Sequence, residues 1–545
     1  MSTVRNGNGI PSAASGGHDA LDHLWVGAVG TVLALMPGAI LSYDQHVFPK
    51  ELVLHVFACT AAVLALLGAR RLRIGAVDAL LAGFLVLGAV STAAAGNGWF
   101  ALRGFSLTLS GLVVFWTARA LTGGGMRGEL VKVVAVAAVA AAATGVLEAY
   151  GVLPGLSSTG RAPGGTIGNR NRLAHLLAIA LPVLVLCAAG ARSRLRFAGG
   201  AAGLFLVSAA LVLTRARAAW VAVAAVGVLA AVLLAAGGWS ALRARLPRRR
   251  VAGLAAAALA GVAAALLLPN RLSWRSDSPY LDTLRTVADY DSGSGRGRLI
   301  QYRNTLRLVA ESPVLGVGPG NWSVEYPRFA SAGDPSFTPE TRLPVTRLPQ
   351  GDWIGLAAER GLPALALLVL AGALVARRSW RRLREGGPGA AGDLALLLSM
   401  GALGTVGLFD PVLLTPASTF VFFLALGALA APEPRAVDLP LGSAGRMAGV
   451  AAVLLLSAAP VLYSGRQLWA GYLYGTRADP GRLARATALN PGDYRAHLLL
   501  AEARIQAGRC DLARASIDAA LGLIPTAPAP RKLWERCTAP GGRGV

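Results

Sequence analysis

The chain alternates long apolar segments with short polar connections over most of its length. Each apolar segment has about the 17–25 residues that a helix needs to cross a bilayer. A spanning segment has to satisfy its backbone hydrogen bonds internally, so these segments are expected to be α-helices. The pattern predicts an all-α polytopic membrane protein with about 12–13 transmembrane helices, at residues 24–43, 50–68, 75–94, 104–122, 130–150, 172–190, 197–214, 217–237, 250–268, 353–376, 391–409, 413–431 and 446–463.

One polar interval, residues 269–352, is far longer than the other connections between the apolar segments. Long loops in compact proteins are usually functional, and binding or catalytic groups concentrate on them. We therefore expect this loop to cover or build a site at one face of the membrane domain.

The arginine clusters give an orientation. They fall in alternate connections, which face the cytoplasm according to the positive-inside rule. This places the N-terminus in the cytoplasm and the long loop and the C-terminal segment in the periplasm. The arginine-rich connections are residues 69–73, 123–129, 191–196, 238–250, 377–384 and 432–446.

Composition agrees with a membrane protein. Hydrophobic residues make up 54% of the chain and charged residues 15%, whereas ordinary soluble proteins carry about 25% charged residues. The net charge of +24 would fit a nucleic-acid-binding protein. However, the arginines lie between apolar segments, so their position argues for membrane orientation and against nucleic acid as a partner.

Three regions follow from these patterns. Residues 1–20 predict a disordered cytoplasmic tail, residues 21–463 a membrane domain, and residues 464–545 a periplasmic helical segment. In this last segment, Ala-Leu-Asn-Pro491 and Gly-Leu-Ile-Pro525 recur at about the 34-residue spacing of a tetratricopeptide repeat, which the segment resembles. It either leans on the membrane domain or a partner protein, or forms a short helical hairpin without a partner.

The cysteines are too few for a disulfide framework. Cys59 and Cys187 lie inside apolar segments and are expected to be buried packing residues. Cys510 and Cys537 lie in the polar C-terminal segment and are able to pair if it faces an oxidising compartment.

Several polar residues lie on outward-facing connections, where basic residues are unexpected. Arginine binds phosphate in a planar, bidentate way and keeps its charge, so arginines converging at one face would suit the diphosphate headgroup of a lipid. An arginine at a helix end is also often an interfacial anchor; this applies least to Arg217, which follows a tight turn on the outer side. Arg217 and Arg298 are the catalytic candidates among them, and the candidates for substrate binding are Arg103, Asn169, Arg170, Asn171, Arg215 and Tyr302.

Other kinds of site find little support. Gly316-Val-Gly-Pro-Gly-Asn321 lacks the strand and helix that a nucleotide site requires, and Pro313 and Pro319 favour an irregular turn. The six histidines show no metal-ligand spacing. We expect neither a metal nor a cofactor.

Four motifs together resemble the O-antigen ligase-like membrane glycosyltransferases. Gly168-Asn-Arg-Asn-Arg-Leu-Ala174 is similar to the Gly-Asn-x-Asn-x-x-Ala motif of that family, and Leu213-Thr-Arg-Ala-Arg-Ala-Ala-Trp220 to its Thr-x-Ser-Arg-x-x-Trp motif, with Ala216 in place of serine. Arg298-Leu-Ile-Gln-Tyr302, followed by Ser312 to Trp322, resembles the long external loop. Trp353 to Gly361 resembles the helix that closes it. The resemblance covers roughly residues 24–431.

The resemblance implies transfer of a glycan from an undecaprenyl-diphosphate-linked donor to an acceptor, such as lipid A–core, outside the inner membrane and without ATP or metal. Arg217 and Arg298 would hold the diphosphate and neutralise its charge as it leaves. Asn169 and Asn171 would orient sugar or pyrophosphate oxygens.

One departure concerns proton transfer. The ligases carry a histidine near the end of the long loop, but Gln350-Gly351 aligns there and residues 269–352 contain no histidine. Asp352 is then the nearest candidate to accept the proton of the acceptor hydroxyl, with Gln350 positioning it. A polysaccharide polymerase is the first alternative function. A transporter for lipid-linked sugars and a scaffold that recruits a protein through its helical tail are the others.

Overall fold

The computed structural model describes most of the chain. The described residues are 47–123, 127–157, 160–238, 247–274, 276–286, 289–291, 293–331, 333–338, 343–344, 347–386, 389–430, 436–475 and 479–538. The cytoplasmic tail predicted at residues 1–20 and the first predicted span, residues 24–43, lie outside them.

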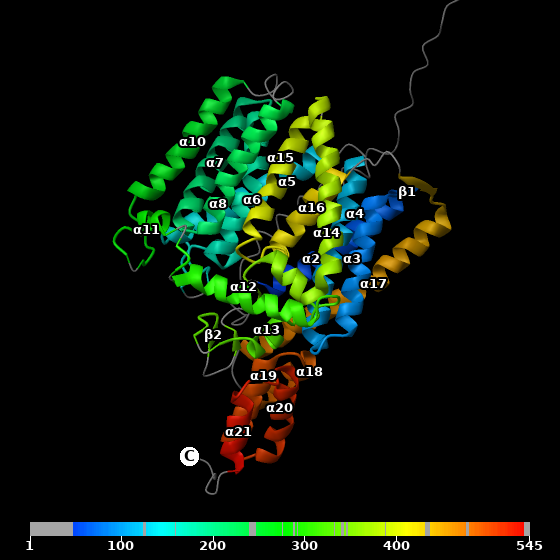
Figure 1. The fold of residues 1–545 in the computed structure, drawn as a ribbon, viewed down its shortest axis with the longest axis vertical. Coiled ribbons are helices and arrows are strands. Elements are labelled where there is room, and N and C mark those ends of the chain that lie inside the picture. The colour runs from blue at the N-terminus through cyan, green and yellow to red at the C-terminus, as the bar shows by residue number, and fades with distance from the viewer. Residues whose placement is uncertain are drawn as a thin grey trace, which may run out of the picture.

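The membrane domain is a bundle of upright helices (Figure 1), and each of the other twelve predicted spans overlaps one of them. Ten helices in the described part are long and apolar enough to cross a membrane, and α15 and α16 are shorter apolar helices. This confirms the all-α polytopic membrane class. In chain order the helices are α2 (Phe48–Gly68), α3 (Ala76–Ala93), α4 (Gly98–Gly123), α5 (Arg127–Ala149), α6 (Arg170–Ala189), α7 (Arg194–Thr214), α8 (Arg217–Leu233), α10 (Arg248–Leu267), α14 (Asp352–Glu385), α15 (Ala390–Val406), α16 (Pro416–Ala430) and α17 (Ser443–Gly475), with a π-helical turn η2 (Leu234–Gly238) extending α8.

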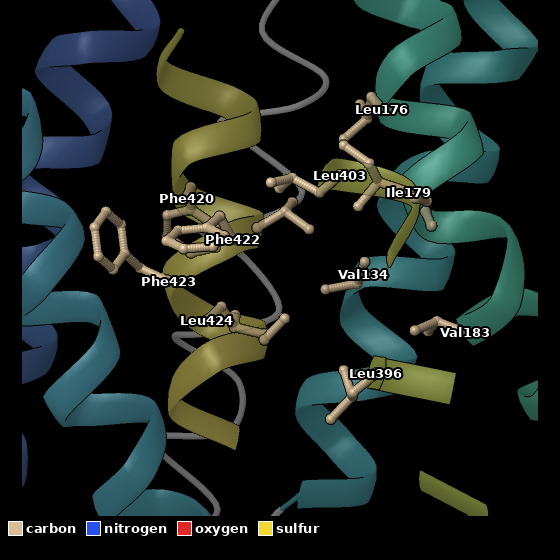
Figure 2. Packing of buried hydrophobic residues seen from close by; sticks show 14 of the residues in the cluster. Val134, Leu176, Ile179, Val183, Leu396, Leu403, Phe420, Phe422, Phe423 and Leu424 are labelled. Carbon is tan, nitrogen blue, oxygen red and sulfur yellow. The ribbon is translucent and has the colours of Figure 1, made fainter. Parts of the chain in front are cut away.

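Helix α16 runs through the centre of the bundle. All of its residues are buried, and Figure 2 shows Phe420, Phe422 and Phe423 among side chains of the neighbouring helices. A helix that is apolar on every side is stable only when it is buried all round. Glycine brings α4 close to it, because a Cβ on Gly111 would lie 2.3 Å from the Phe423 ring.

Two arginine-rich connections meet at one end of the bundle. Strand β1 (Arg71–Ile74) pairs antiparallel with β4 (Val437–Pro440), and Leu72 lies opposite Leu439. Arg73 donates to Asp438 at 2.8 Å. The connection that precedes α3 and the one that precedes α17 therefore lie on the same face, as the predicted orientation requires.

The long loop forms a layer across the opposite end of the bundle. Helix α12 lies across the lower ends of the upright helices in Figure 1. The loop therefore covers this end of the bundle. The elements of this layer are α11 (Pro279–Arg285), α12 (Gly293–Glu311), α13 (Trp322–Glu325), η3 (Tyr326–Arg328), β2 (Phe337–Thr338) and β3 (Leu343–Pro344).

The glycine-rich turn of the long loop, residues 316–321, packs against α14 where that helix is interrupted at Gly361. Val317 N donates to Ala358 O and Gly318 N to Glu359 O, both at 2.9 Å. At the break Gly361 has φ 82 and ψ 164, a conformation nearly restricted to glycine. A Cβ on Gly361 would also lie 2.0 Å from Val314 O. These glycines thus serve close backbone packing.

The C-terminal segment packs on the same face as the long loop. It contains α18 (Pro480–Leu489), α19 (Tyr494–Gln506), α20 (Cys510–Leu523) and α21 (Ala529–Thr538). Asn97 joins three parts of the chain: its amide NH donates to the Asn321 side chain at 2.8 Å and its side chain donates to Leu523 O at 3.1 Å. Trp99 packs against the apolar cluster of this segment. Of the two arrangements left open by the sequence, the structure has the segment leaning on the membrane domain.

A disulfide joins Cys510 to Cys537 and ties the start of α20 to α21. Cys59 and Cys187 are free and partly buried.

Candidate functional site

Helix α12 presents polar groups to the membrane domain. Gln301 is fully buried, and the Tyr302 hydroxyl donates to Leu408 O. The apolar residues Leu299 and Leu306 are exposed instead. A helix with polar side chains on its packed face is either held by specific partners or lines a polar site, because buried polar groups otherwise cost free energy.

Arg298 and His175 meet at one carboxylate. Arg298 Nη2 lies 3.2 and 3.3 Å from the two carboxylate oxygens of Asp410. His175 Nε2, on α6, lies 3.2 Å from Asp410 Oδ2. Burial alone would raise the pKa of Asp410, but His175 and Arg298 outweigh it and hold the pKa of this carboxyl below its usual range. Asp410 is therefore an anion fixed between two basic side chains.

Asp352 supports the loop that carries Asp410. Its Oδ1 accepts from Val412 N at 2.9 Å and from Leu413 N at 2.8 Å, and its own amide donates to Gly407 O at 2.7 Å. The side chain is fully buried. This geometry favours a positioning role for Asp352 over the proton-accepting role predicted from the sequence.

Gln350 contacts α12 through its backbone. Its amide donates to Gln301 Oε1 at 2.6 Å, and Gly351 follows with φ 140. A Cβ on Gly351 would lie 3.2 Å from the Tyr302 hydroxyl. Burial raises the pKa of Tyr302 to about 12, so this hydroxyl is a neutral donor at physiological pH.

Within the described residues, four buried polar atoms around Asp410 have no hydrogen-bond partner: His175 Nε2, Arg298 Nε, Gln301 Nε2 and Asp352 Oδ2. Buried polar atoms are nearly always satisfied in native proteins, so each such atom requires an explanation. These unpaired atoms come from three elements, α6, α12 and α14. A polar ligand bound between the three elements is the simplest single explanation for all of them. We call His175, Arg298, Gln301, Asp352 and Asp410 the polar centre.

Arg217, at the start of α8, lies within electrostatic range of this centre. Arg298 acts on it electrostatically, and Arg217 donates to Thr286 O beyond α11. The residue two positions earlier, Arg215, has φ 54 and closes α7. Among the described residues only Arg215 has a positive φ without being glycine. Such strain persists where the surrounding structure enforces it, which is common at functional sites.

Arg170 and Arg215 share one aromatic ring. Their guanidinium carbons lie 5.0 and 4.6 Å from the centre of the Trp274 ring, and Arg215 Nε donates to Thr283 at 2.9 Å. The cation–π contacts hold two like charges close together. The predicted arginines thus form two neighbouring groups, one at Asp410 and one at Trp274.

The other predicted binding residues have structural partners. Asn169 is the N-cap of α6 and accepts from Asn171 N at 2.9 Å, an arrangement that stabilises the helix start. Arg103 pairs with Glu51 at 3.0 Å and lies over the Phe48 ring. The structure brings neither Asn169 nor Arg103 into contact with the polar centre.

A small hollow lies against α6, near the turn that carries His175. Arg172 and Leu176, on the same turns of α6 as His175, line it together with Lys50 from α2 and with Thr415 and the first residues of α16. In the described part of the chain, no group of three or more His, Cys, Asp or Glu side chains is placed to hold a metal ion.

Sequence reasoning missed His175, Asp410 and Trp274. His175 lies inside an apolar segment and Asp410 in a short connection, so neither stands out in the linear pattern. The available signal was an acidic residue between two apolar segments, Phe409-Asp410-Pro411, since intramembrane carboxylates usually have a partner and a function.

The fold and these residues define a multi-pass, all-α membrane protein with an arginine-rich polar centre under an extramembrane loop. Residues 202–369 match the model of a protein family, described as O-antigen ligase. This match, over about a third of the chain, supports an O-antigen ligase-like family and agrees with the resemblance seen in the motifs. No curated protein matches the chain.

The match has direct consequences for function. A domain of this family supports a glycosyl-transferring role, as ligase or polymerase, and together with the many apolar helices it supports a multi-pass protein of the bacterial inner membrane. The matched segment contains Arg217, Arg298 and the long loop, whereas His175 and Asp410 come from outside it.

Proposed function

We propose that the protein transfers a glycan from an undecaprenyl-diphosphate-linked donor to an acceptor at the periplasmic face. Lipid A–core or a similar lipid-anchored sugar would be the acceptor, and the reaction would need no metal. In this proposal residues 21–463 form the catalytic membrane domain, and residues 464–545 form a periplasmic helical segment that packs on it.

The observation that carries the proposal is that Arg298 on α12 lies within electrostatic range of Arg217 on α8. Guanidinium groups within range of one another repel, so their arrangement becomes more favourable when an anion binds between them. A lipid diphosphate is an anion of suitable charge, and it carries the glycan to the membrane surface.

The remaining residues support this assignment. Asp410 fixes one orientation of Arg298, since Nη2 lies near both carboxylate oxygens. As the bond from the sugar to the diphosphate breaks, negative charge grows on the diphosphate. Fixed guanidinium groups stabilise that charge without having to reorient, which lowers the barrier.

The test uses purified protein with an undecaprenyl-diphosphate-linked oligosaccharide as donor. Lipid A–core and a second copy of the donor are offered separately as acceptors. We expect Arg217→Ala and Arg298→Ala to lower lipid-diphosphate release about 10²–10³-fold, the usual cost of removing one stabilising group. Transfer to lipid A–core supports a ligase, and lengthening of the donor chain identifies a polymerase.

Arg303→Ala is the matched control, because Arg303 lies on the same helix but is exposed. This variant should release lipid diphosphate at the wild-type rate. Wild-type release in both Arg217→Ala and Arg298→Ala would contradict the proposal.

A further inference from the structure

Transfer of a sugar to a hydroxyl group requires a group that accepts the hydroxyl proton. Asp352 and Asp410 already hold fixed partners: two backbone amides in one case, Arg298 and His175 in the other. Asp410, held as an anion between two basic side chains, is a weak proton acceptor. Asp352 uses Oδ1 to hold the connection that carries Asp410. His175 is a titratable side chain of the polar centre that is able to act as a neutral base.

We propose that His175 accepts the proton of the acceptor hydroxyl, with Asp410 holding its ring. The inference rests on the proposed function and assigns a further residue to the same site. It is carried by a buried histidine whose Nε2 lies 3.2 Å from a carboxylate that also binds the diphosphate-holding Arg298.

The carboxylate selects one form of the imidazole. A neutral imidazole has one N–H and one lone pair, and an adjacent carboxylate favours the tautomer with its proton on the near nitrogen. Asp410 faces Nε2, which leaves Nδ1 as the basic atom. Nε2 makes no aligned hydrogen bond, and such contacts commonly tighten when substrate binds.

The step balances without another reactant. The acceptor oxygen forms a bond to the anomeric carbon of the donor sugar, and the bond from that carbon to the diphosphate oxygen breaks. The diphosphate leaves with the electron pair, while the hydroxyl proton passes to Nδ1 of His175. Asp410 then faces an imidazolium cation and stabilises it, and the proton is later lost to water or to the departing diphosphate.

A small hollow lies against the turns of α6 that carry His175. Arg172 and Leu176, which flank His175 on α6, line the hollow described above, and Thr415 lines it from the connection that carries Asp410. No residue of the polar centre lines this hollow, but Arg172 and Leu176 place it near His175 on α6.

The experiment compares His175→Gln with wild type in the donor assay above. Glutamine retains a polar side chain but does not accept a proton. We expect lipid-diphosphate release to fall about 10²–10⁴-fold, the usual contribution of a general base, while donor binding stays within about twofold. His55→Gln is the matched control because His55 is as deeply buried but contacts Ser110 on another helix; it should release lipid diphosphate at the wild-type rate.

A pH profile separates a proton-accepting role from a structural one. Wild-type turnover should fall on acidification in a protonation step that the residual activity of His175→Gln lacks. Added imidazole should restore turnover in His175→Gly. The charged and titratable groups to be considered around this site are Lys50, Arg172, Arg217, Arg298, Tyr302, Asp352 and Asp410.

Three results would overturn the inference: wild-type turnover in His175→Gln, a loss of donor binding equal to the loss of turnover, or the same pH step in the variant. A wild-type protein that binds the donor but transfers nothing would instead overturn the proposed function, and the inference with it. Arg217→Ala separates the role of Arg217 from that of His175, since it should weaken donor binding whereas His175→Gln should not.

Discussion

Arg298 and Asp410 lie 112 positions apart in the chain, yet the guanidinium Nη2 of one lies 3.2 Å from Oδ1 of the other. The two side chains are buried to a similar degree, with exposed fractions of 15% for Arg298 and 12% for Asp410. The pair links the long loop to the connection between α15 and α16. It is thus both a structural tie and the centre of the arginine arrangement.

Asp410→Ala is expected to destabilise the protein by about 3 kcal/mol, because removing one partner of a buried ion pair leaves the other charge uncompensated. Thermal unfolding in detergent measures this loss. Asp438→Ala is the matched comparison: Arg73 and Asp438 form an ion pair with exposed fractions of 57% and 34%, so its loss should cost less than about 1 kcal/mol. Equal destabilisation in the two variants would contradict the importance of the Asp410 contact.

Gly361→Ala should disrupt the packing of the long loop against α14. The backbone conformation alone costs about 1–3 kcal/mol for a residue other than glycine, and the added Cβ would clash with Val314 O. Faster proteolysis within residues 313–322 would report the loss. Gly372→Ala, on the same helix with nothing within 4 Å of its Cβ, should leave proteolysis unchanged; a similar effect of both substitutions would argue against this account.

Thiol labelling tests the disulfide and the proposed orientation together. Cys510 and Cys537 are joined, and disulfides persist in oxidising compartments such as the periplasm. We expect a maleimide to label at most Cys59 and Cys187 in denatured, unreduced protein, and all four cysteines after reduction. Mass spectrometry counts the labels, and four labels without reduction would contradict a periplasmic C-terminal segment.

Acidification should loosen the C-terminal segment through His497. Burial lowers the pKa of His497 below its ordinary value of 6.5, so the unfolded segment binds a proton more readily than the folded one. Stability is therefore full above about pH 6.5 and declines as the pH falls below it. Hydrogen exchange in α19 and α20 at pH 7.5 and 5.5 measures the change, which His497→Gln should reduce; an undiminished pH effect in that variant would assign it to other groups.

The sequence predicts the bundle well and the site only in part. Apolar length determines a spanning helix almost by itself, so twelve predicted spans overlap helices of the structure. The motifs also identified Arg217 and Arg298, which the fold brings together. Asp352 could not be interpreted from sequence, because its role depends on the backbone amides of Val412 and Leu413 that only the fold brings near it.

Contacts between distant segments explain the other differences. Nothing near His175 in the chain indicates that a carboxylate from the α15–α16 connection lies against it. Trp274 was likewise unremarkable until the structure showed two predicted arginines on its ring. Conversely, Arg103 was a plausible ligand-binding residue until Glu51, on another helix, was seen to pair with it.

The β1–β4 pair has a consequence for biogenesis. Arg73 and Asp438 are 365 positions apart, and β4 is followed by only one further membrane helix. A ribosome has to synthesise most of the protein before this pair can form, so the early helices wait in the bilayer without their final neighbour. Closure of the bundle is then a late event in synthesis, and a chain truncated before residue 437 would lack the strand pair that joins the α2–α3 connection to the connection before α17.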